Sequence, residues 1–193
     1  MSEKFLLLDT ETTGLKDSRL VTLAYNIEGE YMIHYGMFKP PIPIEPGASA
    51  ANHLTNEMVK DAPVFSGSED YRKLQELLNT HTLVAHCAAF DAKVLANEGL
   101  IVRKILDTCE LAKRCITGAP NYQLQCLRYF LNLNVIAQAH NSLGDVIVLK
   151  ALFEKLKTLA PHLFPQPFIQ GTILMLEEKH EVKVEIPTTL SAY

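Results

Sequence analysis

Two acidic side chains near the start of the chain have the spacing to bind a metal ion together. They are Asp9 and Glu11, and they follow a run of four apolar residues, 5–8. The run predicts a short strand buried on both faces, and residues two apart in a strand point to the same side. The two carboxylates should therefore face one point where the strand ends.

Such a pair repels itself and loses hydration unless a cation lies between the carboxylates, and oxygen ligands favour Mg²⁺ or Mn²⁺. In the turn that follows, Gly14 should let a ligand approach the main chain closely. The alternative interpretation is a strand end that carries two solvated acids.

Two later segments add a third and a fourth acid. Asp91 follows a short apolar run and is expected in the first turn of a helix, and Asp145 is expected where a long helix begins, after His140. A helix N-terminus favours an acid electrostatically, so each has a structural explanation, and Ser142 could be a simple N-cap. An isolated histidine is more often a surface residue. The functional alternative brings both acids and the histidine to the sheet edge that carries the first pair.

The composition is that of an ordinary globular chain. Of its 193 residues, 48% are hydrophobic and 21% are charged, and the formal net charge is −4. This gives no broad basic surface for duplex DNA or RNA, but an enzyme that holds one strand end through metal ions needs few basic residues. No apolar run is long enough to span a membrane, and the N-terminus lacks a signal-peptide pattern. The four cysteines show no Cys-x-x-Cys spacing, which predicts reduced thiols in a cytoplasmic protein.

The spacing of apolar residues changes along the chain from strand-like to helix-like. Strands are expected at 5–8, 19–27, 31–38, 82–85, 101–106 and, as an edge strand, 182–186. Helices are expected at 69–79 after a capping box that starts at Ser66, and at 90–98, 108–115, 123–131 and 143–159. The four prolines between 40 and 46 predict an extended loop. Antiparallel strands followed by alternating helices and strands predict an α/β fold with a mixed sheet and helices on its faces.

Five motifs in this order resemble the DEDDh exonucleases, the DnaQ-like family with an RNase H-like fold. They are Asp9-Thr10-Glu11-Thr12-Thr13-Gly14, Asn52-His53-Leu54-Thr55, His86-Cys87-Ala88-Ala89-Phe90-Asp91, Asp107-Thr108 with Leu111-Ala112, and His140 to Asp145. The resemblance runs from about residue 4 to 156 and is strongest to exonuclease X and the proofreading subunit of bacterial DNA polymerase III. Cys87 replaces the usual Asn and Ser142 replaces a common Ala, and neither change removes an acid or the histidine.

The resemblance implies a five-stranded mixed sheet, an antiparallel meander followed by parallel strands, and a two-metal-ion reaction. It implies that two Mg²⁺ or Mn²⁺ ions about 3.5–4 Å apart are held by four acids, namely Asp9, Glu11, Asp91 and Asp145. His140 would act as general base on the attacking water. The expected product is a nucleoside 5′-monophosphate released from the 3′ end of single-stranded DNA or RNA.

The same resemblance implies a pocket for the terminal nucleotide. Its expected lining is the backbone around Thr12 and Thr13, the side chain of Leu15, and His53 and Phe90, where aromatic stacking would tolerate any base. Ordinary core and loop packing is the alternative for Phe90 and His53. Six basic residues are candidates for phosphate contacts or, alternatively, solvated helix surface: Lys93, Arg103, Lys104, Lys113, Arg114 and Arg128.

The expected division is an exonuclease domain at 1–160 and an extension of unknown role at 161–193, packed on the same domain. A DNA polymerase and a second copy of the chain are the candidate protein partners, and no membrane is expected. Two other functions are kept open: an adaptor with a nuclease fold that binds nucleic-acid ends without cutting, and a metal-dependent phosphohydrolase of small nucleotides.

Overall fold

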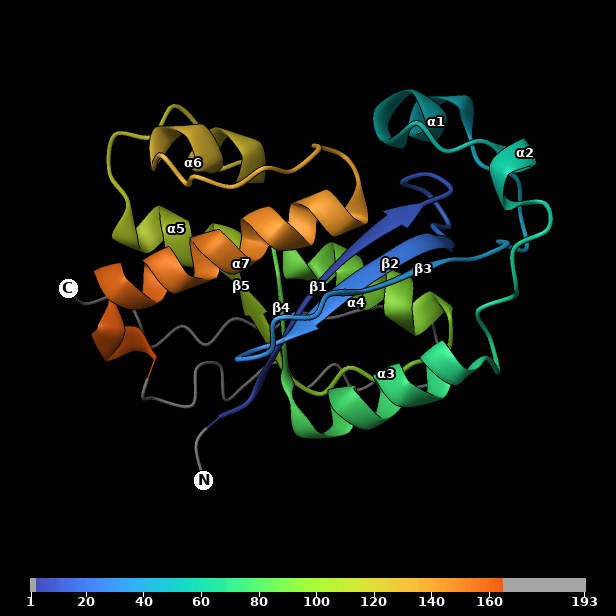
Figure 1. Cartoon of the computed structure of the whole chain (residues 1–193), viewed down its shortest axis with the longest axis horizontal. Helices are drawn as coiled ribbons and strands as arrows, with labels where there is room; N and C mark the ends of the chain where they lie inside the picture. The colour runs from blue at the N-terminus through green and yellow to red at the C-terminus, as the bar shows by residue number, and fades with distance from the viewer. Residues whose placement is uncertain (1–2, 165–193) are drawn as a thin grey trace.

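A five-stranded mixed sheet lies at the centre of the computed structural model, which describes residues 3–164 (Figure 1). The strands are β1 (Phe5–Thr12), β2 (Leu20–Ile27), β3 (His34–Met37), β4 (Thr82–Ala85) and β5 (Ile105–Asp107). Their order is β3-β2-β1-β4-β5, with antiparallel pairing from β3 to β1 and parallel pairing from β1 to β5. The predicted meander followed by parallel strands is confirmed.

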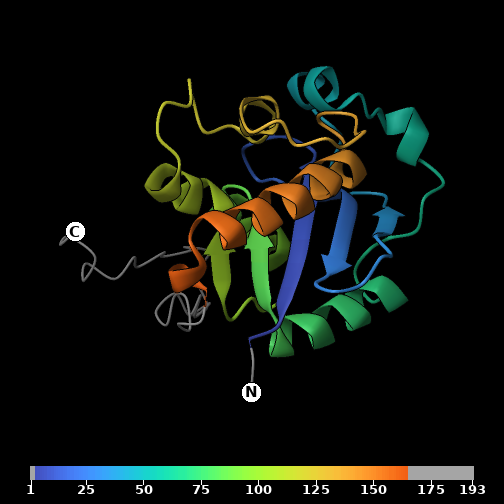
Figure 2. The ribbon, with the colours of Figure 1, turned by 60° about the vertical axis from the view of Figure 1, so that its left-hand side comes forward.

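Helices cover both faces of the sheet because the residues of β1 alternate between two cores. Leu6 and Leu8 pack with side chains of α3 (Glu69–Thr80) and α4 (Ala88–Asn97). Phe5 and Leu7 point the other way and pack with side chains of α5 (Thr108–Cys115), α6 (Leu124–Phe130) and α7 (Ser142–Leu159). Figure 2 shows α7 lying diagonally across its face of the sheet. Burial on both faces is what the four-residue apolar run predicted.

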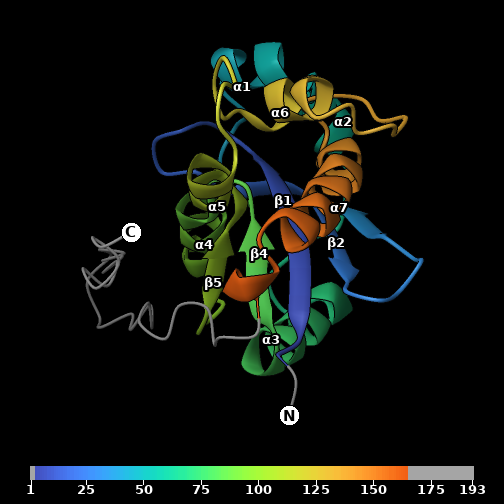
Figure 3. The ribbon, with the colours of Figure 1, turned by 90° about the vertical axis from the view of Figure 1, so that its left-hand side faces the viewer.

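The chain after β3 is extended over the proline cluster, as predicted, and residues 40–45 form neither helix nor strand. Two short helices that the sequence analysis did not predict then follow, α1 (Pro46–Asn52) and α2 (Asn56–Val59). Pro46 occupies the start of α1, a position where its missing N–H costs no hydrogen bond. Both helices lie beyond the end of the sheet toward which β1 points (Figures 1 and 3).

Several boundaries also need correction. β1 continues to Thr12, so Asp9 and Glu11 lie inside the strand and not after it. The reason is that β2 pairs with β1 from Leu6 to Thr12, whereas β4 pairs only with Phe5 to Leu7. The acids thus lie where one neighbouring strand has ended.

The helix caps differ from the sequence prediction at two sites. Ser68, not Ser66, caps α3, and its hydroxyl accepts a hydrogen bond from the Tyr71 N–H. Asn141, not Ser142, caps α7. β3 and β5 are shorter than predicted.

The end of the described chain packs on the same domain. A short 3-10 helix, η1 (Pro161–Leu163), follows α7, and the Phe164 ring lies edge-on to Phe153 with centroids 5.6 Å apart. The predicted strand at 182–186 and the rest of the predicted extension lie outside the described residues. Within residues 3–164, no helix combines the length and hydropathy needed to cross a bilayer.

Candidate functional site

Three carboxylates converge between the C-terminal half of β1, which β4 no longer pairs with, and the N-terminal end of α7. One oxygen each from Asp9, Glu11 and Asp145 lies within 4.8 Å of the others. Asp9 and Glu11 are partly exposed, whereas Thr10 between them is buried, as the alternation of a strand requires. The acids of two segments separated by more than a hundred residues in sequence therefore share one site.

The fourth predicted acid, Asp91, lies beside this group on α4. It is buried, and its Oδ1 accepts hydrogen bonds from the Thr10 N–H at 3.1 Å and the Thr10 hydroxyl at 2.8 Å. These bonds fix Asp91 against β1. Its charge is close enough to raise the pKa of Asp9, although its oxygens fall outside the 4.8 Å group of three.

Asp145 is held by donors from two directions. Its Oδ1 accepts a hydrogen bond from the Gln125 amide of α6 at 2.6 Å, and its Oδ2 accepts one from the Asn141 N–H at 3.2 Å. Ser142 bonds to the hydroxyl of Thr22 on β2 at 2.9 Å. The serine that looked like an N-cap therefore docks the start of α7 onto the sheet.

His140 lies at the end of the loop that joins α6 to α7, next to Asp145. Its side chain is exposed and its φ is 54°, a left-handed backbone conformation. In its cationic form, His140 lowers the pKa of Asp145, which places the ring within electrostatic reach of that carboxylate. The structure thus brings the predicted base to the predicted acids.

The loop that carries His140 is fastened to both flanking helices. The Arg128 guanidinium donates hydrogen bonds to the carbonyl oxygens of Val135 at 2.7 Å and Ala137 at 3.0 Å. Gly144 of α7 is buried, and a Cβ at that position would collide with the Gln138 carbonyl. The position of His140 therefore depends on the hydrogen bonds of Arg128 and on the absence of a Cβ at Gly144.

All four carboxyl groups of the site have pKa values above the ordinary value. Burial, followed by Asp91, Asp145 and Glu11, raises the pKa of Asp9 well above its ordinary value. Burial and the charge of Asp145 raise the pKa of Glu11 to about 7. Burial also raises the pKa of Asp91 to about 7 against the hydrogen bonds from Thr10, and it raises the pKa of Asp145. A cluster of buried and mutually repelling carboxylates suits hard divalent cations, because bound cations would favour the charged forms against both burial and repulsion.

The residues predicted to line a nucleotide pocket differ in exposure and in the contacts of their side chains. Leu15 is 82% exposed, and His53 is exposed at the C-terminal end of α1. Phe90 is partly buried against the core. The Thr12 hydroxyl bonds to the Gly14 carbonyl, and the Thr13 hydroxyl accepts the Arg19 N–H. The predicted pocket role concerns the backbone around Thr12 and Thr13, which these hydroxyl contacts do not test, and the pocket assignment stays a prediction.

Gly14 lies beside the segment that precedes α1. A Cβ at Gly14 would lie 2.5 Å from the Glu45 carboxylate, whose residue also donates its N–H to the Thr13 carbonyl at 2.8 Å. The glycine therefore lets the segment before α1 pack against the end of β1, and its predicted role in the approach of a ligand stays a prediction.

Two residues that support the acids were not identified from the sequence. Asn52 of α1 donates a hydrogen bond to the Thr12 carbonyl at 3.3 Å, and its amide lowers the pKa of Glu11. Gln125 of α6 holds Asp145. Asn52 directly precedes the predicted pocket residue His53, which was a usable signal. Nothing in the local sequence distinguished Gln125, because its role depends on how α6 packs over α7.

Several of the predicted basic residues have partners inside the protein. Lys104 pairs with Glu3, Lys113 pairs with Glu110, and Arg128 holds the loop before α7. These contacts favour the structural interpretation of those three residues over a phosphate-binding patch.

Comparison with known proteins places this arrangement among nucleases. A family model described as Exonuclease (RNase_T) matches residues 6–153. The chain is 30% identical over 162 residues to the DNA polymerase III subunit epsilon of Treponema pallidum, covering 77% of this chain and 74% of the relative. It is 27% identical to the PolC-type DNA polymerase III of Caldanaerobacter subterraneus over 93% of this chain, but the match spans only 13% of that relative's length.

Solved structures agree with the sequence matches. Exonuclease X in complex with 5′ overhanging duplex DNA superimposes with a TM-score of 0.68 and 28% identity, covering 81% of this chain and 93% of that one. Escherichia coli exonuclease I with a dT13 oligonucleotide gives a TM-score of 0.69 at 18% identity, covering 84% of this chain and 43% of that one. The second likeness concerns the fold alone.

Proposed function

Because this chain belongs to the RNase T-type exonuclease family, we propose that it is a two-metal-ion 3′–5′ exonuclease. It hydrolyses the last phosphodiester bond at the 3′ end of DNA or RNA and releases a nucleoside 5′-monophosphate. The observation that carries this proposal is the convergence of Asp9, Glu11 and Asp145 within 4.8 Å, with Asp91 beside them.

The donor set suits the ions that this chemistry needs. Asp9, Glu11, Asp91 and Asp145 would hold two Mg²⁺ or Mn²⁺ ions, because carboxylate oxygens are the ligands these hard cations prefer. When bound, such ions activate water and stabilise the charge on the leaving oxygen. The hydrogen bonds from Thr10 and Gln125 keep Asp91 and Asp145 oriented for this task.

The remaining residues have roles in proton transfer and substrate placement. His140 takes the proton of the water that attacks the phosphorus atom, and the bond from phosphorus to the 3′ oxygen breaks. Its exposure lets a substrate end enter beside it. Leu15 and Phe90 offer apolar contacts to the terminal base, which would not discriminate among bases.

A gel assay with end-labelled substrates tests the proposal. Single-stranded DNA, single-stranded RNA, blunt duplex DNA and 5′-overhanging duplex DNA would each be labelled at the 5′ or the 3′ end and incubated with Mg²⁺, Mn²⁺ or EDTA. We expect a metal-dependent ladder from 5′-labelled strands and immediate release of a mononucleotide from 3′-labelled ones. The 5′-overhanging duplex is included because exonuclease X was solved with such DNA.

The same assay separates the alternative functions. An adaptor would retain the labelled ends in a mobility-shift gel and release no nucleotide with any metal ion. A phosphohydrolase of small nucleotides would cleave a nucleoside triphosphate faster than an oligonucleotide at equal concentration. Either result would contradict the exonuclease proposal.

The predicted protein partners are tested separately. A polymerase partner is suggested by the names of the relatives, but this chain spans only 13% and 10% of the two PolC-type polymerases that it matches. Light scattering of the purified chain, alone and with a polymerase catalytic subunit from the same organism, would show whether it is a monomer, a homodimer or part of a complex.

A further inference from the structure

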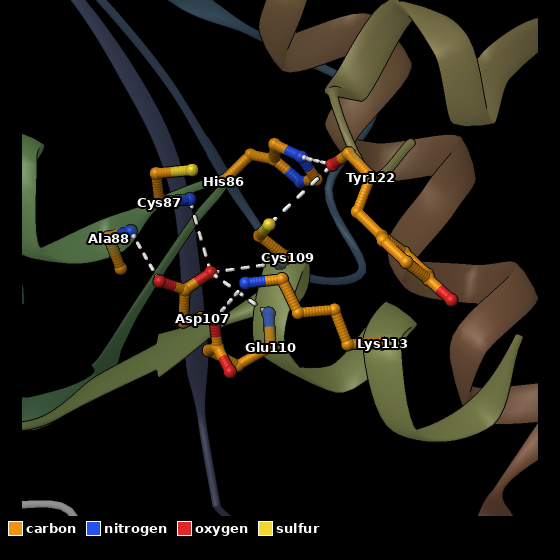
Figure 4. Close-up of polar contacts among 8 residues, drawn as sticks. All are labelled: His86, Cys87, Ala88, Asp107, Cys109, Glu110, Lys113 and Tyr122. Atoms are coloured by element: carbon orange, nitrogen blue, oxygen red, sulfur yellow. Dashed lines mark hydrogen bonds and ion pairs between the residues drawn. The ribbon is translucent and has the colours of Figure 1, made fainter. Parts of the chain in front are cut away.

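A second group of metal-binding side chains lies where α4 and α5 begin. It consists of His86 after β4, Cys87 at the N-cap of α4 and Cys109 in the first turn of α5 (Figure 4). One ring nitrogen of His86 and the two sulfur atoms lie within 4.8 Å of one another. The two cysteines are 22 residues apart in sequence, so only the fold brings them together.

The His86 ring is held as a metal-binding histidine usually is. Its Nε2 lies 2.7 Å from the Tyr122 carbonyl oxygen, which can only accept, so the neutral ring carries its proton there. The lone pair is then on Nδ1, 2.9 Å from the Thr108 hydroxyl. That hydroxyl is also 3.2 Å from the Ala85 carbonyl and can donate to it instead. A carbonyl that accepts one ring N–H, so that the other nitrogen presents its lone pair, is the common support of a metal-bound imidazole. A metal ion at Nδ1 would replace the contact with the Thr108 hydroxyl, which keeps the Ala85 carbonyl as its acceptor.

The backbones that carry the two sulfur atoms are fixed by one carboxylate. Asp107 accepts hydrogen bonds from the N–H groups of Cys87 at 3.1 Å, Ala88 at 3.0 Å and Cys109 at 2.8 Å (Figure 4). These bonds tie the start of α4 to the start of α5. They also occupy both oxygens of Asp107, so the protein ligands are the histidine and the two cysteines.

We propose that His86, Cys87 and Cys109 bind one thiophilic divalent cation, with Zn²⁺ as the physiological ion. In a tetrahedral zinc site the ligand atoms lie about 3.6–3.8 Å apart, given Zn–S near 2.3 Å and Zn–N near 2.0–2.1 Å. Atoms already within 4.8 Å reach this spacing by a shift of about 1 Å. Cys87 is exposed, which leaves the fourth position to water or to an external ligand.

This centre differs in chemistry from the carboxylate cluster. Two thiolates and an imidazole select soft or borderline cations, whereas the carboxylates select Mg²⁺ or Mn²⁺. The two sites nevertheless share α4, which has Cys87 at its N-cap and Asp91 in its first turn. A zinc ion bound by Cys87 would therefore anchor α4, the helix that also carries the carboxylate of Asp91.

A cadmium titration tests the proposal through a signal that carboxylates do not give. Cd²⁺ bound to thiolate produces an ultraviolet charge-transfer band, so reduced full-length protein would be titrated anaerobically with Cd²⁺ and then with Zn²⁺ against a chromophoric chelator. We expect one equivalent to produce the band, Zn²⁺ to abolish it, and the melting temperature to rise. The zinc content of freshly purified protein would be measured in parallel.

Cys87→Asn is the informative variant, because Cys87 has a φ of 67° and asparagine tolerates that conformation better than most residues. It should fold at least as stably and bind Zn²⁺ at least ~100-fold more weakly, since outer partners of a ligand alone account for about 10–100-fold. Cys115→Ser removes a thiol from α5, the helix that carries Cys109, and should leave the charge-transfer band intact. Asp9→Asn should also leave it intact, which separates this centre from the proposed nuclease site.

Three results would overturn the proposal. The first is a wild-type protein without a charge-transfer band at one equivalent of Cd²⁺. The second is a band of equal intensity and affinity in Cys87→Asn. The third is zinc binding that disappears with Asp9→Asn but persists without Cys87, which would place the ion on the carboxylates.

Discussion

Asp9 and Asp145 lie in the same cluster, but their surroundings act differently on the pKa of the two carboxyl groups. Every influence on Asp9 raises its pKa: burial first, then Asp91, Asp145 and Glu11. Burial also raises the pKa of Asp145, but the Gln125 amide, the Asn141 N–H and His140 all act against it. On β1, Asp9 lies close to three other acids. At the start of α7, Asp145 accepts hydrogen bonds that stabilise its charged form.

The difference follows from the elements that carry the two residues. Most backbone N–H groups of a strand pair with its neighbours, and the Thr10 N–H of β1 donates to Asp91, so burial and the other acids dominate the pKa of Asp9. The first turn of a helix has unpaired N–H groups, and α6 adds an amide from above. The strand side of the site therefore depends on bound cations for neutralisation, whereas the helix side is partly stabilised without them.

The largest expected effect tests this comparison directly. Asp9→Asn should abolish cleavage because it removes a metal ligand, and it should raise the metal-free melting temperature because it removes repulsion. A gain of 1 kcal/mol in stability corresponds to about 2–4 °C in a domain of this size. Asp145→Asn should also abolish cleavage but should not raise the melting temperature, because it loses charge-assisted hydrogen bonds. Differential scanning fluorimetry in EDTA measures both, and equal shifts would refute the comparison.

His140→Ala should separate proton transfer from metal binding on the helix side. We expect the single-turnover rate to fall by ~10²–10⁴-fold, the usual contribution of a positioned general base. Stabilisation by Mn²⁺ should remain close to wild type, because the histidine is not assigned as a ligand. His162→Ala removes an exposed histidine from η1, which carries no predicted site residue, and controls for general effects of the substitution. A rate within a few-fold of wild type would mean that His140 is not the base.

Gly144→Ala tests how far the helix side depends on packing. The new Cβ would collide with the Gln138 carbonyl and push away the loop that carries His140. Because a misplacement of about 1 Å can cost ~10²-fold in rate, we expect a loss of ~10–100-fold. Gly47→Ala on α1 is the matched control, since a Cβ there meets nothing within 4 Å. Circular dichroism would verify that both variants fold, and an unaffected Gly144→Ala rate would contradict the assigned role of the loop.

The smallest expected effect is the pH dependence of metal binding. The raised pKa of Glu11 and of Asp91, both about 7, means that the metal-free native state holds protons that the unfolded chain has released. Metal-free stability should therefore fall as pH rises from the ordinary carboxyl range to about 7. Bound metal must displace these protons, so its apparent affinity should rise by about tenfold per pH unit for each proton until pH 7, and then level off.

Calorimetric titration of Mg²⁺ or Mn²⁺ between pH 5.5 and 8.5 measures this dependence. Glu11→Gln should give a shallower pH dependence than wild type. An affinity that is constant across this range would contradict the raised pKa values of Glu11 and Asp91.

The sequence by itself determined the parts of this protein that depend on neighbours in the chain. Alternation along a strand placed Asp9 and Glu11 on one side, and apolar runs marked β1 and β4 as buried on both faces. The order of the elements also predicted the mixed sheet. These features follow from local periodicity and from residue types, which are fully present in the sequence. Motif resemblance then supplied the grouping of Asp91, His140 and Asp145 with the first pair.

Only the tertiary structure decided which residues support the acids and how the second cluster forms. Gln125 reaches Asp145 because α6 packs over α7. Arg128 holds the loop before α7 by donating hydrogen bonds to two carbonyl groups of that loop. Cys87 and Cys109 had no metal-binding spacing in the sequence, yet the parallel strands β4 and β5 end side by side and bring the two cysteines together. Contacts of this kind join residues far apart in the chain, so they depend on how whole elements pack and not on any local pattern.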